Sequence, residues 1–276
     1  MSPTLILIRK EIRDSLRNRW VLAVTLLLAM LALSLGFLGS APTGSVKVDP
    51  LTVTVVSLSS LSIFLVPLIA MLLSYDAIVG EIDRGTMALL LSYPVSRHQV
   101  MAGKFLGHLA TLSLATFLGY GVAGVALQAA HGEFDPAAWG PFGLLIAASI
   151  LLGASFLALG YLISALVQER ATAAGLAIGV WLFLVVIQDM VLLGILVADQ
   201  GRLITDAALN VILLFNPADV YRLLNLTGHE NIAMYAGMAG LSGQVTLSAM
   251  TLLLVQLLWI ALPLALASWV FNRRAL

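Results

Sequence analysis

Three side chains in the segment from Asp199 to Ala249 are of types that bind copper. His229, Met234 and Met238 offer an imidazole and two thioethers, which suit copper in either oxidation state, and the methionines are four residues apart, as on one face of a helix. Methionine is also a flexible apolar filler, and the chain contains 9 of them. The favoured interpretation is a surface that contacts another protein, and a metal site is the alternative.

Motifs for catalysis or nucleotide binding do not occur in the sequence. There is no G-x-x-x-x-G-K-[ST] run to hold the phosphates of ATP, and neither H-E-x-x-H nor G-x-S-x-G is present. Cysteine is absent, which removes disulfides, thiolate nucleophiles and thiolate metal sites. Asp189 is the only acid within an apolar run, and the sequence shows no basic partner for it inside the membrane. We therefore expect a protein that is not an enzyme and binds no cofactor of its own.

Charged and turn-forming residues gather in one segment, from Asp76 to Lys104. Its acidic first part ends at a Gly-Thr break, and a short apolar helix follows from Met87 to Leu91. Pro94 disfavours helical geometry at Tyr93, so the chain must turn there, and Ser96 is placed to cap a new helix. A short helix between two breaks suits the transmission of movement from a soluble protein to two membrane helices. An ordinary connecting loop is the alternative, and the residues alone leave both open.

The rest of the chain is too apolar for a water-soluble protein. Hydrophobic residues make up 61% and charged residues 10% of the 276 residues, the mean hydropathy is +1.03 and the net charge is zero, which gives nucleic-acid binding no electrostatic basis. We predict an all-α membrane protein with a single domain over residues 1–276. Six runs free of Lys and Arg are long enough to cross a hydrocarbon core of about 30 Å; they are Val21–Leu38, Val53–Leu73, Phe105–Ala130, Phe142–Leu166, Ala171–Ala198 and Met250–Phe271.

The basic residues predict the orientation of these spans. Eleven of the 14 Lys and Arg lie in the N-terminus, in the loops after spans 2 and 4, and in the C-terminus. Because flanking Lys and Arg resist translocation, both termini and residues 76–104 should be cytoplasmic, and residues 199–249 should be periplasmic. Before span 1, residues 1–19 should form an interfacial helix that begins at Ser2 and Pro3, with a basic face of three arginines and an apolar face toward the membrane.

The 51 residues from 199 to 249 are too many for a plain connection. Their apolar pattern predicts two short amphipathic helices, split at Asn216 and Pro217, that lie on the outer membrane surface. In the fifth span, Gly175 and Gly179 form a G-x-x-x-G pair, which serves either internal packing or contact with a second copy of the chain. Polar side chains within the spans are few, so the sequence does not favour a hydrated channel for a free metal ion.

The cytoplasmic loop resembles a known family signature. The stretch E-I-D-R-G-T-M-A-L-L-L-S-Y-P-V-S-R, followed by G-K, is similar to the Glu-x-x-x-Gly-Thr … Leu-Leu … Pro-x-Ser-Arg … Gly-Lys signature of ABC-2 type permeases. That resemblance implies the type V exporter-like fold, with an interfacial N-terminal helix, six spans and a coupling helix that docks in a groove of a separate ATPase. It assigns this role to Glu81, Asp83, Arg84, Gly85, Thr86, Met87, Leu90, Leu91, Pro94 and Arg97. Of these, we expect the charged side chains at a polar rim, and Met87, Leu90 and Leu91 in the groove.

Within that family, three segments resemble the permeases of nitrous oxide reductase maturation systems: Arg9–Trp20, Tyr75–Glu81 and Gly103–His108. The resemblance implies a homodimer in the bacterial inner membrane with two copies of a cytoplasmic ATPase, which would bind ATP and Mg²⁺. It also implies a periplasmic β-helical copper-handling partner. The complex would move a small sulfur- or copper-related species, or relay ATPase motion mechanically. The alternative is a scaffold that transports nothing and anchors the periplasmic protein.

Overall fold

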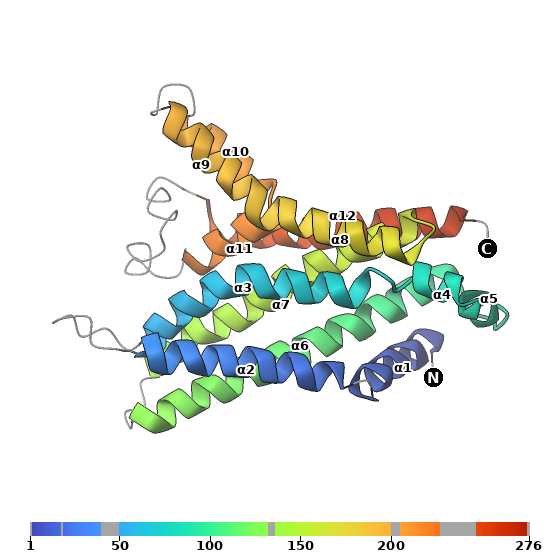
Figure 1. Cartoon of the computed structure of the whole chain (residues 1–276), viewed down its shortest axis with the longest axis horizontal. Coiled ribbons are helices and arrows are strands. Elements are labelled where there is room, and N and C mark those ends of the chain that lie inside the picture. The colour runs from blue at the N-terminus through green and yellow to red at the C-terminus, as the bar shows by residue number, and fades with distance from the viewer. Residues whose placement is uncertain are drawn as a thin grey trace.

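The structure, a computed structural model, describes residues 2–17, 19–39, 50–131, 136–199, 205–226 and 247–274, and these ranges contain helices, turns and no strand. Figure 1 shows a bundle of long helices with α4, α5 and both labelled chain ends at one end. The elements are α1 (Pro3–Arg17), α2 (Trp20–Gly39), α3 (Pro50–Ser74), α4 (Val79–Asp83), α5 (Thr86–Leu91), α6 (Arg97–His131), α7 (Pro136–Leu166), α8 (Arg170–Leu182), the π-helix η1 (Phe183–Ile187), α9 (Gln188–Asp199), α10 (Asp206–Leu214), α11 (Pro217–Leu226) and α12 (Ala249–Arg273).

The long helices agree with the predicted spans. Among the described residues, five helical segments are long and apolar enough to cross a membrane, and the bent pair α1–α2 adds a sixth. The spans are α2, α3, α6, α7, the continuous run α8–η1–α9, and α12. α1 meets α2 at 65°, which separates the N-terminal helix from the first span. Its interfacial position remains a prediction.

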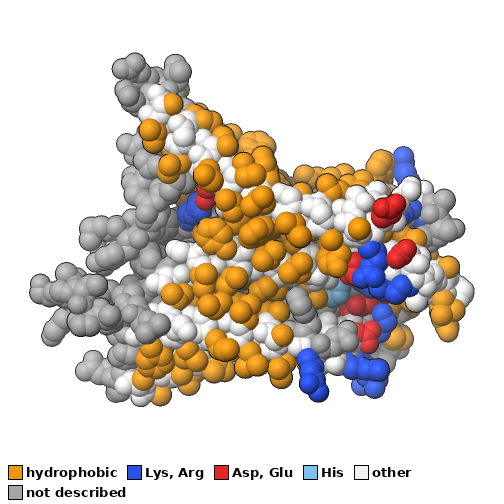
Figure 2. All heavy atoms as spheres, in the orientation of Figure 1, with side chains coloured by type: hydrophobic (Ala, Val, Ile, Leu, Met, Phe, Trp, Pro, Cys, Tyr) orange, Lys and Arg blue, Asp and Glu red, His pale blue; other side chains and the backbone are white. Residues whose placement is uncertain are grey.

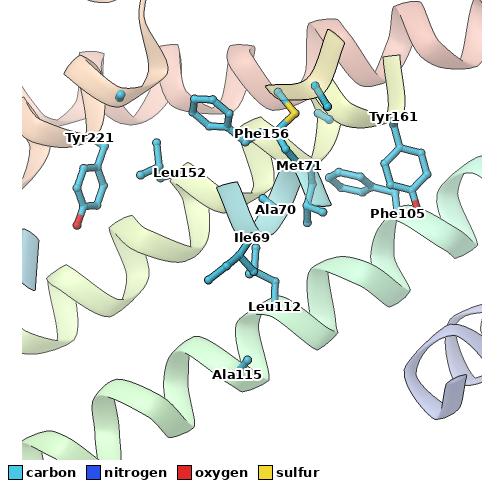
Figure 3. Packing of buried hydrophobic residues seen from close by; sticks show 14 of the residues in the cluster. Ile69, Ala70, Met71, Phe105, Leu112, Ala115, Leu152, Phe156, Tyr161 and Tyr221 are labelled. Atoms are coloured by element: carbon cyan, nitrogen blue, oxygen red, sulfur yellow. The ribbon is translucent and has the colours of Figure 1, made fainter. Parts of the chain in front are cut away.

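The core of the bundle lies around α7. This helix packs against α3, α6, α11 and α12, and Figure 3 shows its residues Leu152, Phe156 and Tyr161 among side chains from α3, α6 and α11. The most apolar 18-residue stretch of each span differs in burial. In α7, 67% of this stretch is buried inside the chain, whereas the share is 17% in both the α8–α9 run and α12. These two spans therefore present wide faces to lipid or to a partner.

Within the excursion between the last two spans, the helix α11 enters the bundle instead of lying on its surface. The helices α10 and α11 do split at Asn216, as predicted. However, Trp259 Nε1 donates to the Leu214 carbonyl at 3.0 Å, and Asn216 Nδ2 donates to the Leu184 carbonyl at 2.8 Å. Trp259 lies ten residues into α12, so the turn between α10 and α11 reaches about 15 Å along that span. The surface location predicted for α11 is therefore wrong, because α11 packs against α3, α7 and α12. The described residues of α10 are exposed or half-buried, so its location at the membrane surface stays a prediction.

Asp189 also has the basic partner that the sequence did not reveal. Arg222 Nη2 lies 2.6 Å from Asp189 Oδ2, an ion pair that connects α11 to α9. Arg222 had been placed with the residues outside the membrane, and the entry of α11 into the bundle brings it to Asp189. The predicted copper ligands His229, Met234 and Met238 lie outside the described residues.

Candidate functional site

The segment between α3 and α6, residues 75–96, forms a rigid turn that we call the elbow. It contains α4 and α5, of which only the second was predicted, and Gly85 joins them with φ of +71°, in the left-handed region that favours glycine. Thr86 Oγ1 donates to the Glu81 carbonyl at 3.1 Å and ties the two helices together. The elbow is therefore ordered by local bonds.

The elbow leads directly into α6. The Ser96 hydroxyl accepts from the Gln99 backbone N–H at 3.2 Å, and Gln99 Oε1 accepts from the Ser96 N–H at 2.9 Å. This reciprocal pair is a capping box, and it confirms the predicted cap at Ser96. Movement of the elbow must therefore displace the start of α6.

Two glycines of α6 bring the N-terminal helix close. A Cβ atom at Gly103 would lie 2.6 Å from Leu7 Cβ, and one at Gly107 would lie 2.5 Å from Glu11 Cβ. Larger residues would push α1 away, since real Cβ atoms essentially never approach so closely. The four-residue spacing of these glycines is a signal for helix contact that our sequence interpretation missed.

The close approach of α1 creates a buried ion-pair network of Lys10, Glu11, Glu81, Lys104 and His108. Lys104 Nζ donates to one carboxylate oxygen of Glu11 and one of Glu81, each at 2.8 Å, and Lys104 is 3% exposed. Lys10 Nζ reaches the same two oxygens at 3.1 and 3.5 Å. The network therefore joins α1, α4 and α6.

Histidine extends the network toward the core. His108 Nε2 lies 3.4 Å from Glu11 Oε2, and its Nδ1 is 2.8 Å from the Tyr161 hydroxyl of α7. Burial alone would raise the pKa of the Glu11 carboxyl, but the hydrogen bond with His108 and the charge of Lys104 outweigh it and hold that pKa well below its ordinary value. A polar cavity of about 400 Å³ lies beside the network. Figure 2 shows acidic and basic side chains gathered at this end of the molecule.

The elbow is also bonded to the adjoining ends of spans 4 and 5, the end of α7 and the start of α8. The Ser164 hydroxyl accepts from the backbone N–H groups of Ile78 and Val79 at 3.0 and 3.1 Å, and so holds the first turn of α4 against α7. Arg170, the first residue of α8, donates to Asp76 Oδ2 at 2.8 Å. Spans 4 and 5 are thus attached to the elbow by separate contacts.

Arg97, the first residue of α6, attaches the chain directly after the elbow to the last span. Its Nη1 donates to the carbonyls of Phe271 and Arg274 at 2.7 Å each, where α12 ends and its carbonyls lack helical partners. Arg274 in turn donates to the Ala165 carbonyl at the end of α7, at 3.2 Å. We had expected Arg97 at the rim of a partner's groove, and the structure places its guanidinium against the chain's own C-terminal helix end.

The exposed face of α5 differs from the predicted one. Met87 is fully buried in the chain's own core, and Leu90 and Leu91 are half-buried against that core, so Met87 is not available to fill a groove in a partner. The exposed large side chains are Leu89, at 64% exposed, and Tyr93, at 62%. Both were missed; Leu89 lies on α5, and Tyr93 lies in the turn two residues after its end.

The remaining predicted residues divide between the surface and the interior. Asp83, Arg84, Gly85, Thr86 and Pro94 are exposed around α5, as a docking surface requires. Glu81 is 8% exposed and belongs to the buried ion-pair network, so it positions the elbow from within. The elbow thus consists of an exposed tip, with Leu89 and Tyr93, and a buried base bonded to α1, α6, α7 and α8.

Comparisons with known proteins agree with this architecture. A family model described as "ABC-2 family transporter protein" matches residues 5–276. The chain is 47% identical over 267 residues to the "Probable ABC transporter permease protein NosY" of Pseudomonas aeruginosa and 45% identical over 268 residues to the protein of the same name from Stutzerimonas stutzeri. Each alignment covers 96% of both proteins. The chain is therefore a multi-pass membrane protein of the ABC permease kind and belongs to the ABC-2 transporter family.

Proposed function

We propose that this permease receives the motion of a separate cytoplasmic ATPase through the exposed tip of the elbow, at Leu89 and Tyr93. The observation that carries the proposal is the combination of two exposed apolar side chains, Leu89 on α5 and Tyr93 just after it, with a buried base bonded to four other helices. An exposed apolar patch at the end of a polar surface favours contact with another protein. A scaffold that only anchors a periplasmic protein has no need of such a connection.

The buried base supports transmission because it resists local deformation. Separating Lys104 from Glu11 and Glu81 would leave buried charges without partners, at a cost of about 3–5 kcal/mol. The elbow would then move α1, α6 and α4 together when the tip is displaced. Arg97 and Arg170 would carry the same displacement to α12 and α8 through their bonds to Phe271 and Asp76.

Substitutions at exposed and at buried positions of the elbow test this function. Leu89→Ala together with Tyr93→Ala should abolish co-purification of the ATPase while the thermal stability of the permease is unchanged, because both side chains are exposed. Met87→Ala should lower stability by about 2–5 kcal/mol, as expected for a buried Met, and should retain the ATPase. Full retention of the ATPase by the first variant would eliminate α5 as the docking element.

We also propose that two copies of the chain assemble through the fifth span. Cβ atoms at Gly175 and Gly179 would meet nothing within 4 Å, so this face of α8 is open to close approach by another helix. The low burial of this span supports the same arrangement. Because the chain has no cysteine, Gly179→Cys can be cross-linked by oxidation in native membranes, with Ala158→Cys, at a fully buried position of α7, as its control. Absence of a dimer band from Gly179→Cys would contradict this interface.

The biological role is proposed from the resemblance to the NosY permeases. We place the chain in the bacterial inner membrane with both termini cytoplasmic, in a complex that serves the maturation of the copper sites of nitrous oxide reductase with a periplasmic β-helical copper-handling protein. Eleven of the 14 Lys and Arg on one predicted side support the orientation. Deletion of the gene should leave the reductase without its copper centres, as measured by its absorption spectrum. A normal spectrum would exclude this role.

A further inference from the structure

An unusual charge cluster lies at the junction of α9 and α11, far from the elbow. One guanidinium, that of Arg222, bridges two carboxylates: its Nη2 lies 2.6 Å from Asp189 Oδ2, and its Nη1 lies 2.6 Å from Asp219 Oδ1. Asp219 is 1% exposed, and its second oxygen, Oδ2, is buried with no hydrogen-bond partner among the described residues. The cluster thus holds one more acid than base and an unused carboxylate oxygen.

The backbone of the fifth span is adapted to this contact. The π-helix η1 ends at Ile187, two residues before Asp189, and π-helical turns often occur at functional sites. Within η1, the Leu184 carbonyl accepts from Asn216 Nδ2 at 2.8 Å, while Asn216 Oδ1 accepts from the Ala218 N–H at 2.9 Å and caps α11. The turn between α10 and α11 is therefore fastened to the fifth span by one neutral and one charged contact.

Among the described residues, the helices around the cluster supply no second positive charge. The sequences of α3, α7 and η1 contain no Asp, Glu, Lys, Arg or His, the one charged residue of α12 is Arg273 at its far end, and α10 contributes Asp206 at its first residue. The phenol of Tyr221, the residue before Arg222, is 3.2 Å from the Ser149 hydroxyl of α7. With both carboxylates ionised, the cluster would carry one net negative charge beside the buried Asp219, where unpaired charge is costly.

We propose that Asp189, Arg222 and Asp219 form a proton-binding latch, in which one proton held by the carboxylate pair keeps the α10–α11 hairpin fastened to the fifth span. Two carboxylates that share one site retain a proton far more readily than either alone. With the proton bound, the cluster is neutral and the buried Oδ2 of Asp219 can carry it. Loss of the proton leaves a net negative charge, which favours hydration and release of the hairpin toward the extracytoplasmic side. The latch does not depend on the proposed docking of the ATPase.

Single-cysteine labelling tests the latch in the full-length chain, which has no native cysteine. Ala218→Cys places a thiol on α11 at a position that is 1% exposed, and Val197→Cys places a reference thiol at a position of α9 that is 70% exposed. Both variants would be reconstituted in liposomes and labelled with a membrane-impermeant maleimide between pH 5.5 and 8.5. The ratio of the two rates corrects for the effect of pH on thiol reactivity.

The latch predicts that this ratio rises at least roughly tenfold over the range, since the deprotonated fraction changes about tenfold per pH unit below the pKa. In the Asp219→Asn background, the ratio should stay low and flat, because the amide mimics the protonated acid; Asp219→Glu should restore the rise. If the ratio of labelling rates stays flat with pH when Asp219 is intact, the proposal is overturned. This outcome does not depend on whether the Asp219 variants fold. An unchanged pH-dependent rise in Asp219→Asn also overturns it.

Discussion

Lys104 is the side chain whose removal should most damage the base of the elbow. It is 3% exposed and donates to Glu11 and Glu81, so Lys104→Met keeps a side chain of similar length but leaves two buried carboxylates without their central cation. Removing one partner from a buried charge cluster costs about 3–5 kcal/mol. Lys10 touches the same carboxylates, but its side chain is 47% exposed, so Lys10→Met should cost at most about 1 kcal/mol.

Thermal unfolding of the purified protein in detergent measures this difference. By the scaling for soluble domains of similar size, the expected loss lowers the Tm by roughly 6–20 °C for Lys104→Met. Adding Glu11→Gln and Glu81→Gln to that variant should recover part of the loss, because the unpaired charges are then gone. Equal Tm values for Lys104→Met and Lys10→Met, or no recovery in the triple variant, would refute the view that a buried ion-pair network holds the elbow.

Two further predictions concern the contact between α1 and α6. The pKa of Glu11 is lowered in the folded protein, so its contribution to stability is fully present above the ordinary pKa of 4.5 and is lost as the pH falls below that value. Glu11→Gln should therefore flatten the acid side of a curve of stability against pH. An unchanged acid side would contradict this prediction. Gly103→Ala should destabilise by about 1–3 kcal/mol, because the new Cβ would lie 2.6 Å from Leu7 Cβ. A Cβ atom at Gly121 of the same helix would meet nothing within 4 Å, so Gly121→Ala should be neutral or stabilising in the same unfolding assay. A greater loss of stability from Gly121→Ala than from Gly103→Ala would count against close packing of α1.

Features set by local physics could be predicted from the sequence. The spans follow from apolar runs bounded by charged residues, and the turn before α6 follows from Pro94 and the capping pair of Ser96 and Gln99. The division between α10 and α11 at Asn216 and Pro217 was likewise local, because Pro217 has no backbone donor and suits the first turn of a helix.

Features set by tertiary contacts could not be predicted. The helix α5 is apolar on both faces, so the sequence did not reveal that Met87 points inward and Leu89 outward. Asp189 and Arg222 are 33 residues apart and meet because α11 enters the bundle. Arg97 looked like a surface charge, and its bonds to the end of α12 depend on a contact across 174 residues.

The most direct test of the elbow as the point of ATPase contact is site-specific photo-cross-linking in the assembled complex. A photoreactive phenylalanine analogue at Tyr93, which is 62% exposed on the elbow, should form an adduct with the ATPase subunit. The same analogue at Phe215, which is 69% exposed at the turn between α10 and α11, should form none. An ATPase adduct from Tyr93 alone is the predicted result; no adduct from Tyr93, or equal adducts from both positions, would contradict the account.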